Sequence, residues 1–339
     1  MRRAIQLILG IVISVLALAL AFYDTDPAQL AAALREANYV YLVPGLALVW
    51  LGLYFRAASW RAILGGGVPY RRVFDAMNEG YLLNNLLPFR LGEFGRAYLI
   101  SRGTRLSAIQ ALSSVVVERV IDLLMAVVLL LAFLPFVAAV AWAGQLTSAS
   151  VLLGITALVV LVIVSRNQAT LAGWARALLE RVRIRWLHPD RWVARFEALL
   201  AGLSVFQDPR RAFAAAAWSL LAWIAAGFGT WFMLLAFLPA ATIPMAFIVL
   251  TVVALGAAVP SAPGAAGVFE LAVVYVLAFF DVPREQALSF GLTLHILQIA
   301  LTAVLGGLAL AREGETVAHL ARSAQALVAR AERPAAPPA

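Results

Sequence analysis

Cysteine and lysine are both absent from this sequence, and histidine occurs only three times. Without cysteine the chain has no disulfide framework, no thiol nucleophile and no thiolate metal site. Without lysine it has no Schiff-base chemistry and no phosphate-loop lysine. The three histidines, His188, His295 and His319, lie far apart along the chain. We therefore expect no metal site, and the sequence indicates no cofactor.

Charged residues are also scarce, at 13% of the 339 residues, whereas hydrophobic residues make up 63%. A soluble protein of this length could not bury so much apolar surface. The formal net charge of +8 could suggest nucleic acid, but the arginines flank apolar segments, as determinants of membrane orientation do. We therefore expect a membrane protein that does not bind nucleic acid.

Long, nearly uncharged segments are candidates for membrane spans. A helix rises about 1.5 Å per residue, so about 20 residues cross a hydrocarbon core roughly 30 Å thick. The candidates are residues 4–22, 41–55, 120–142, 151–164, 212–238, 246–259, 271–280 and 287–311. Because 246–259 and 271–280 are too short to span alone, the sequence predicts an all-α polytopic protein with about seven full spans and additional broken helices.

The distribution of arginine predicts how these segments are oriented. Arg2 and Arg3 favour a cytoplasmic N-terminus, followed by an uncleaved first span. Residues 74–100 begin and end beside arginines, so they should enter the membrane from the cytoplasm and return as a re-entrant segment. Residues 240–281 should form a second re-entrant segment that enters from the opposite side.

These boundaries predict a membrane domain over residues 1–311 and a basic cytoplasmic tail over 312–339. Within the domain, residues 166–211 are rich in arginine and carry an interleaved apolar stripe. They fit helices that lie on the inner leaflet, broken at His188-Pro189-Asp190, or a plain basic cytoplasmic loop. Several tryptophans are expected to face lipid or anchor the interface: Trp50, Trp60, Trp218, Trp223 and Trp231.

The densest polar cluster lies in the first re-entrant segment, at residues 84–96. On a helix, Arg90, Glu93 and Arg96 would share one face because they are three residues apart. Such charges are costly in lipid unless protein or a polar cavity surrounds them. We expect an anionic headgroup site in which guanidinium groups bond phosphate; the alternative is a structural ladder of ion pairs.

The same segment carries amides and helix breakers. Asn85, with Asn78, Glu79 and Asn84, would line the segment, either for polar packing or for ligand contact. Pro88 and Gly92 would break the helix.

The next span contains Glu118, Arg119 and Asp122. Glu118 and Asp122 are four residues apart and share a helix face, whereas Arg119 points about 100° away. Charges within a span need partners. These residues could continue the polar site, with one acid coupling transport to protons, or they could neutralise one another.

The second re-entrant segment repeats the spacing of the first. Pro88-x3-Gly92-x-Phe94 matches Pro263-x3-Gly267-x-Phe269, and an acid lies beside each, Glu93 and Glu270. Two opposed, interrupted segments are typical of inverted-repeat transporters, whose substrate site lies between broken helices.

The second motif allows two readings. Pro263, Gly264 and Gly267 would free helix ends that favour an anion, or they would form a tight turn in which Glu270 bonds backbone N–H groups. His295 and Gln298, on one face of the last span, are expected to make interhelical hydrogen bonds.

In this order the motifs resemble the membrane domain of the lysylphosphatidylglycerol synthase family, also called flippase-like proteins. The resemblance is carried by three motifs. The first comprises Asn84, Pro88, Arg90, Gly92, Glu93 and Arg96, and the second comprises Val116, Glu118, Arg119 and Asp122. The third comprises Pro263, Gly264, Gly267 and Glu270. The resemblance covers nearly the whole chain. It implies an inner-membrane protein that flips an aminoacylated phospholipid or another phospholipid or polyisoprenoid carrier. Fused synthases carry a soluble domain after the spans, where this sequence has only residues 312–339, so aminoacyl transfer is not expected.

Three functions are compatible with these features. The first is a transporter that moves an anionic phospholipid or a polyisoprenoid-phosphate-type lipid between leaflets, with Arg90, Arg96 and Arg119 on the phosphate. No nucleotide-binding motif is present, so transport would be downhill, ion-coupled or driven by a partner. The second is an accessory protein for a lipid-modifying enzyme. The third is a membrane enzyme acting on a lipid phosphate, for which the sequence has no histidine-rich or aspartate-rich motif.

Overall fold

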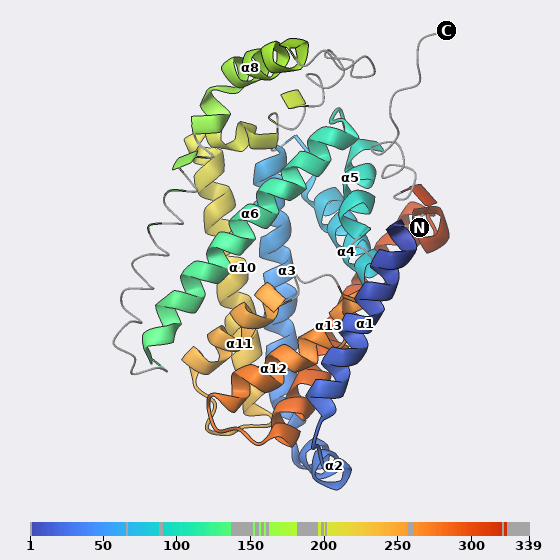
Figure 1. The fold of residues 1–339 in the computed structure, drawn as a ribbon, viewed down its shortest axis with the longest axis vertical. Coiled ribbons are helices and arrows are strands. Elements are labelled where there is room, and N and C mark those ends of the chain that lie inside the picture. Colours follow the sequence, from blue (N-terminus) through green and yellow to red (C-terminus); the bar gives the residue numbers. More distant parts are fainter. Residues whose placement is uncertain are drawn as a thin grey trace.

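The computed structural model describes residues 2–65, 67–87, 91–102, 104–136, 163–181, 202–256 and 261–320, with residues 152, 156, 159–160, 196–197, 200 and 322–323. All regular elements in these ranges are helices, which confirms the all-α prediction. The helices form an elongated bundle, with α2 (Pro27–Glu36) at one end and α8 (Gln168–Arg181) at the other (Figure 1).

Three described helices are long and apolar enough to cross a membrane. They are α3 (Leu42–Leu64), α10 (Pro209–Leu235) and α13 (Arg284–Glu313). A fourth candidate is α1 (Arg2–Phe22) taken with α2, although the pair is bent by 82°. The predicted spans at 120–142 and 151–164 lie partly outside the described residues, so about seven spans stays a prediction.

Small residues bring α3 and α10 together along their length. A Cβ on Gly45 would lie 3.1 Å from the carbonyl oxygen of Gly229, and one on Gly52 would lie 3.2 Å from that of Ala222. Close backbone approach of this kind holds helices together where lipid removes the hydrophobic driving force between them. α3 continues to Leu64, beyond the apolar segment that ends at residue 55, and it carries Arg56 in its second half.

Two helical hairpins occupy opposite halves of the bundle. The first joins α4 (Tyr70–Leu86) to α5 (Gly92–Arg102), and the second joins α11 (Ile243–Gly256) to α12 (Val268–Ala278) through the 3₁₀ turn η5 (Pro263–Ala265). Figure 1 shows the first in the upper half and the second in the lower half. The chain is therefore interrupted at the predicted breaks, although Pro88 and Arg90 lie outside the described residues.

The first hairpin is closed at both ends by hydrogen bonds between a side chain and the backbone. Near its open end, Arg72 Nη2 donates to the carbonyl oxygen of Leu99 at 2.8 Å. At its tip, the N–H of Gly92 donates to Asn84 Oδ1 at 2.8 Å. Also at the tip, a Cβ on Gly92 would lie only 1.8 Å from the carbonyl oxygen of Gly80. The two helices are thus antiparallel and cross at a pair of glycines.

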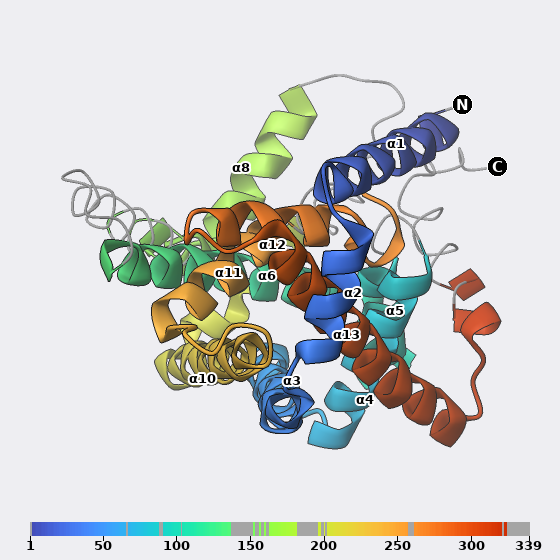
Figure 2. The same ribbon diagram turned by 90° about the horizontal axis from the view of Figure 1, so that it is seen from below.

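A single long helix, α6 (Ala108–Phe133), runs obliquely past both hairpins (Figure 1). Its start is fixed by a capping box, in which Ser107 Oγ accepts from the N–H of Gln110 and Gln110 Oε1 accepts from the N–H of Ser107. It packs on α5 near one end and on α11 near the other. Seen from below in Figure 2, α13 lies between the two hairpins.

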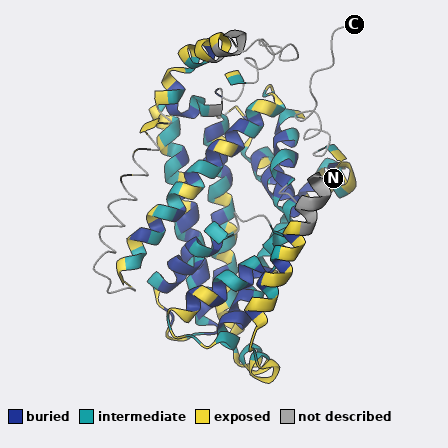
Figure 3. Cartoon of the chain, in the orientation of Figure 1, coloured by how far each residue is buried: buried dark blue, intermediate teal, exposed yellow. Residues whose placement is uncertain are grey.

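The core has one large cluster in each half, and α1 presents an exposed apolar face (Figure 3). Leu9, Val15 and Leu16 are about half exposed, as lipid-facing residues would be. Two tryptophan predictions are wrong: Trp60 and Trp223 are buried, because each indole N–H bonds a polar side chain inside the bundle.

Candidate functional site

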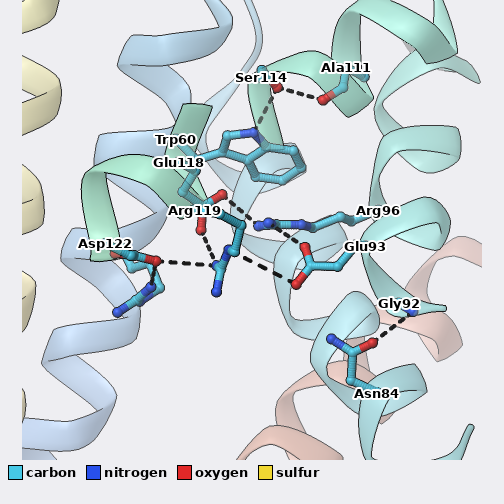
Figure 4. Close-up of polar contacts among 11 residues, drawn as sticks. Trp60, Asn84, Gly92, Glu93, Arg96, Ala111, Ser114, Glu118, Arg119 and Asp122 are labelled. Atoms are coloured by element: carbon cyan, nitrogen blue, oxygen red, sulfur yellow. Dashed lines mark hydrogen bonds and ion pairs between the residues drawn. The ribbon is translucent and has the colours of Figure 1, made fainter. Parts of the chain in front are cut away.

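Arg96 is the centre of a buried ion network between the first hairpin and α6 (Figure 4). Its side chain is 1% exposed. Its two terminal nitrogens contact Glu93 Oε2 at 2.6 Å and Glu118 Oε2 at 2.7 Å. The guanidinium also lies 4.6 Å from the ring centroid of Trp60, whose indole N–H donates to Ser114 Oγ. Arg96 is therefore held on three sides.

Arg119 and Arg56 extend the network toward α3. Arg119 Nη2 lies 2.6 Å from Glu118 Oε1 and 3.3 Å from Asp122 Oδ2, and its Nε lies 4.0 Å from Glu93 Oε1. Asp122 also pairs with Arg56, and it accepts a hydrogen bond from the indole of Trp223. The network thus joins α3, α5 and α6.

Among the described residues, the network is balanced in formal charge, with three arginines and three carboxylates. These are Arg56, Arg96 and Arg119 with Glu93, Glu118 and Asp122. Glu93 and Arg96 share a helix face and form an ion pair, as the alternative of a structural ladder expected. Arg119 was expected to point away from Glu118 and Asp122, but its long side chain reaches both.

Arg56 is the residue of this network that sequence reasoning missed. Arg56 and Asp122 are 66 positions apart in the chain. The signal in the sequence was that eight residues able to continue the helix follow Arg56, which places Arg56 within the helix rather than at its end. Arg90, predicted to share the face of Glu93, lies outside the described residues.

The tip of the second hairpin is a hydrogen-bonded turn. Glu270 Oε2 accepts from the N–H of Gly267 at 2.7 Å, and Glu270 Oε1 lies 2.6 Å from His295 Nδ1. The other ring nitrogen of His295 lies 2.8 Å from the carbonyl oxygen of Gly264, so that nitrogen carries a proton. Glu270 thus bonds the backbone, as the tight-turn reading expected, and His295 bonds across helices.

Glycine is required at this tip for two reasons. Gly264 and Gly267 have φ values of +68° and +86°, which residues with a Cβ rarely adopt. A Cβ on Gly267 would also lie 2.4 Å from the carbonyl oxygen of Ser14 on α1. The turn therefore packs directly against the first helix.

A cavity of about 750 Å³ lies between the tips of the two hairpins. Tyr81, Asn84 and Asn85 line it from the first hairpin, and residues 261–265 line it from the second. Its remaining walls are mainly apolar and come from α1, α3, α10, α11, α12 and α13. Asn85 Nδ2 donates to Thr302 Oγ1 of α13 at 2.9 Å.

Of the six network residues, Arg56 is the one that lines this cavity, and its side chain is 21% exposed. His295 and Gln298 also line the cavity, and so do Pro263 and Gly264. The structure therefore connects the charged network to the cavity through α3. Arg96 does not line the cavity. The direct contact between Arg96 and a phosphate that the sequence suggested therefore does not follow from this arrangement.

Comparison with known proteins gives a family and no individual relative. No curated protein and no solved structure matches the chain. A family model described as the lysylphosphatidylglycerol synthase TM region matches residues 7–306. This match covers most of the chain, including both hairpins, the ion network and the cavity. The chain therefore belongs to the family of lysylphosphatidylglycerol synthase transmembrane regions, a family of membrane proteins in lipid metabolism.

Proposed function

We propose that the protein is a lipid transporter that moves the headgroup of an anionic phospholipid or a polyisoprenoid-phosphate-type lipid between leaflets. The observation that carries this proposal is the cavity shared by the tips of two hairpins from opposite halves of the bundle. A substrate site between opposed, broken helices is the arrangement that alternating access requires. The two hairpins would be the mobile parts of an inverted repeat.

The size and lining of the cavity suit a headgroup. Ligand pockets in proteins enclose about 300–1,000 Å³ and combine apolar walls with a few polar groups. Here the polar groups include the amides of Asn85 and Gln298 and the guanidinium of Arg56. The helix starts at the two tips are already bonded, by Asn84 and by Glu270. We therefore assign headgroup binding to the side chains of the cavity rather than to free helix ends.

Arg56 is the group best suited to meet a phosphate. It is partly exposed to the cavity, and its carboxylate partner, Asp122, also pairs with Arg119. A phosphate that approached Arg56 could replace Asp122, because Asp122 would keep Arg119 and Trp223 as partners. Arg96 would then be a positioning residue that joins α5 to α6.

We further propose that the protein acts in the inner (plasma) membrane, with about seven spans and with both termini in the cytoplasm. The arrangement of arginine around the apolar segments supports this orientation. Its ligands would be membrane lipids, and a lipid-modifying enzyme that makes or uses the cargo would be its protein partner. We propose transport rather than catalysis because the polar groups of the cavity are arranged for binding.

An accessory role for an envelope-lipid enzyme is the second candidate. The basic residues 166–211 and the exposed apolar face of α1 could support a partner in the membrane. An accessory protein would need no cavity between its hairpins, so filling the cavity separates the two functions.

The test is lipid movement in vesicles that contain only the purified protein. Phosphatidylglycerol with a fluorescent acyl chain is placed in both leaflets, and dithionite reports the fraction that reaches the outer leaflet. Ala254 lines the cavity, so the indole of Ala254→Trp should occupy part of it, obstruct the passage of the headgroup and abolish movement. Ala300 is exposed on α13, and Ala300→Trp should move lipid like the wild type.

Two results would overturn the proposal. One is a wild-type protein that leaves anionic lipid, zwitterionic lipid and polyisoprenyl phosphate in their original leaflets. The other is an Ala254→Trp variant that moves lipid as fast as Ala300→Trp. Mass spectrometry of the lipid retained by the wild type and by Arg56→Gln would identify the cargo class as the one lost in the variant.

A further inference from the structure

Glu79 is a buried acid that belongs neither to the ion network nor to the cavity lining. It lies in the middle of α4, and its residue is 0% exposed. Neither of its carboxyl oxygens has a hydrogen-bond partner among the described residues. An acid in this position is unusual, because buried polar groups in proteins are almost always bonded.

The acids around Glu79 all have arginine partners. Asp75, one turn earlier on α4, lies 3.7 Å from Arg71 and 3.6 Å from Arg312 of α13. Glu313 pairs with Arg72, and Glu315 pairs with Arg102. Glu79 is the member of this acidic group to which the structure gives no cation.

The charged side chains close to Glu79 come from α4 and α13. They are Arg72, Asp75, Glu313 and the following Glu315. The charged side chains of the other helices packed on α4 are paired with other groups. On α5, Arg96 is bonded to Glu93 and Glu118. On α3, Arg56 pairs with Asp122, and Arg61 donates to the carbonyl oxygen of Val68. The 3₁₀ turn η5, which also contacts α4, carries no charged residue.

An ionised carboxylate without a partner is costly inside a protein, and such a group takes up a proton instead. We propose that Glu79 is a proton-binding site, neutral in this structure, and that its protonation couples movement of the α4–α5 hairpin against α13 to a proton gradient. The coupling rests on the proposed transport function. The protonation of Glu79 does not.

The position of Glu79 along α4 suits this role. Arg72, Asp75 and Glu79 follow one another at spacings of three and four residues, so they share one face of the helix. Glu79 lies about 14 Å along the axis from the start of α4 and about 9 Å before Asn85, which lines the cavity. It is therefore located between a charged helix end and the substrate site, on the same rigid element.

Close packing explains why the proton is retained. Just beside Glu79, a Cβ on Gly306 of α13 would lie 2.6 Å from the carbonyl oxygen of Asn78. Glu79 itself is 0% exposed, so bulk water does not reach its carboxyl group in this conformation. If the hairpin moved away from α13, water would reach the carboxyl group, which would release its proton. The carboxylate could return to the closed position only after it had bound a proton again.

The first measurement is the infrared spectrum of the purified full chain at neutral pH. A protonated carboxyl group gives a C=O stretching band that a carboxylate does not. We expect Glu79→Gln to lose part of this band and the matched control Asp75→Asn to keep it, because Asp75 is paired with arginine. A spectrum unchanged by Glu79→Gln would overturn the proposal. Glutamine is the neutral isostere of a protonated glutamate, so failure of Glu79→Gln to fold would overturn it as well.

The second measurement is lipid distribution in vesicles with an imposed pH gradient. Coupling of one proton to one lipid allows an accumulation of up to about tenfold per pH unit. We expect the wild type and Asp75→Asn to accumulate lipid on one side, and Glu79→Gln to move lipid equally in both directions. Accumulation by Glu79→Gln would refute the coupling. No lipid movement by the wild type would refute transport, and the infrared result would still decide whether Glu79 holds a proton.

Discussion

Replacing Arg96 with methionine should destabilise the protein by about 3–5 kcal/mol, the usual cost of removing one partner from a buried ion pair. Arg96 is almost completely enclosed, and it bonds Glu93 and Glu118 at the same time. Its loss would leave Glu118 buried with Arg119 alone. The contact between the guanidinium and Trp60 adds to this cost, since a desolvated cation–π contact contributes up to about 2 kcal/mol.

Two further variants show where this energy originates. Arg96→Lys keeps the charge but lacks the forked guanidinium that bonds two carboxylates, so we expect a smaller but clear loss. The double variant Arg96→Met with Glu118→Gln should be more stable than the sum of its single changes predicts. The second change removes the carboxylate that the first one isolates. Arg102→Met, on an ion pair whose arginine is 48% exposed, is the control and should have little effect.

The assay is reversible unfolding in mixed micelles, followed by circular dichroism as the fraction of denaturing detergent increases. The midpoint should fall furthest for Arg96→Met and least for Arg102→Met. An Arg96→Met protein that unfolds within about 1 kcal/mol of the wild type would refute a structural role for this network. A headgroup role for Arg96 would instead show as lost lipid retention in a protein of unchanged stability.

Two other changes test the hairpin and the end of α13. Gly92→Ala should prevent the hairpin from closing, because its Cβ would overlap the carbonyl oxygen of Gly80, and chromatography should show no folded protein. A Cβ on Gly307 would meet nothing within 4 Å. Gly307→Ala should therefore stabilise the protein by about 0.5–1 kcal/mol, as thermal unfolding would show. Burial alone would raise the pKa of Glu315, but hydrogen bonds, chiefly from Arg102, lower it. The ionised carboxylate of Glu315 should therefore stabilise this end of the helix at pH values above the usual glutamate pKa. This stabilisation should disappear as the pH falls through the lowered pKa of Glu315. Hydrogen exchange at residues 315–320 should show this loss of protection, and Glu315→Gln should lose protection already at neutral pH.

Local spacing was enough to predict the features that depend on neighbours in the chain. The pairing of Glu93 with Arg96 follows from a separation of three residues on a helix. The turn at Gly264 and Gly267 follows from the positive φ values that glycine permits. The all-helical fold follows from the composition, because only helices and closed barrels satisfy the backbone in lipid.

Contacts between distant helices could not be predicted in the same way. Nothing in the sequence indicates that Arg56 pairs with Asp122, because the choice among several acids depends on how α3 packs against α6. Trp60 was expected to face lipid or anchor the interface, since tryptophan is common at membrane interfaces. It is buried because Ser114 satisfies its N–H and Arg96 covers its ring, and both partners come from other helices.

The charge balance of the network bears directly on how an anionic lipid could bind. Among the residues that the structure describes, three arginines pair with three carboxylates, so this part of the network offers no excess positive charge while all pairs are closed. An anion that binds one of these three arginines must therefore displace a carboxylate, and Arg56 is the one of the three that lines the cavity. A site of this kind does not hold phosphate tightly, because the displaced Asp122 competes for the same guanidinium. Weak, reversible binding is what a transporter needs, whereas a protein that stores an anionic lipid would be expected to keep an unpaired cation.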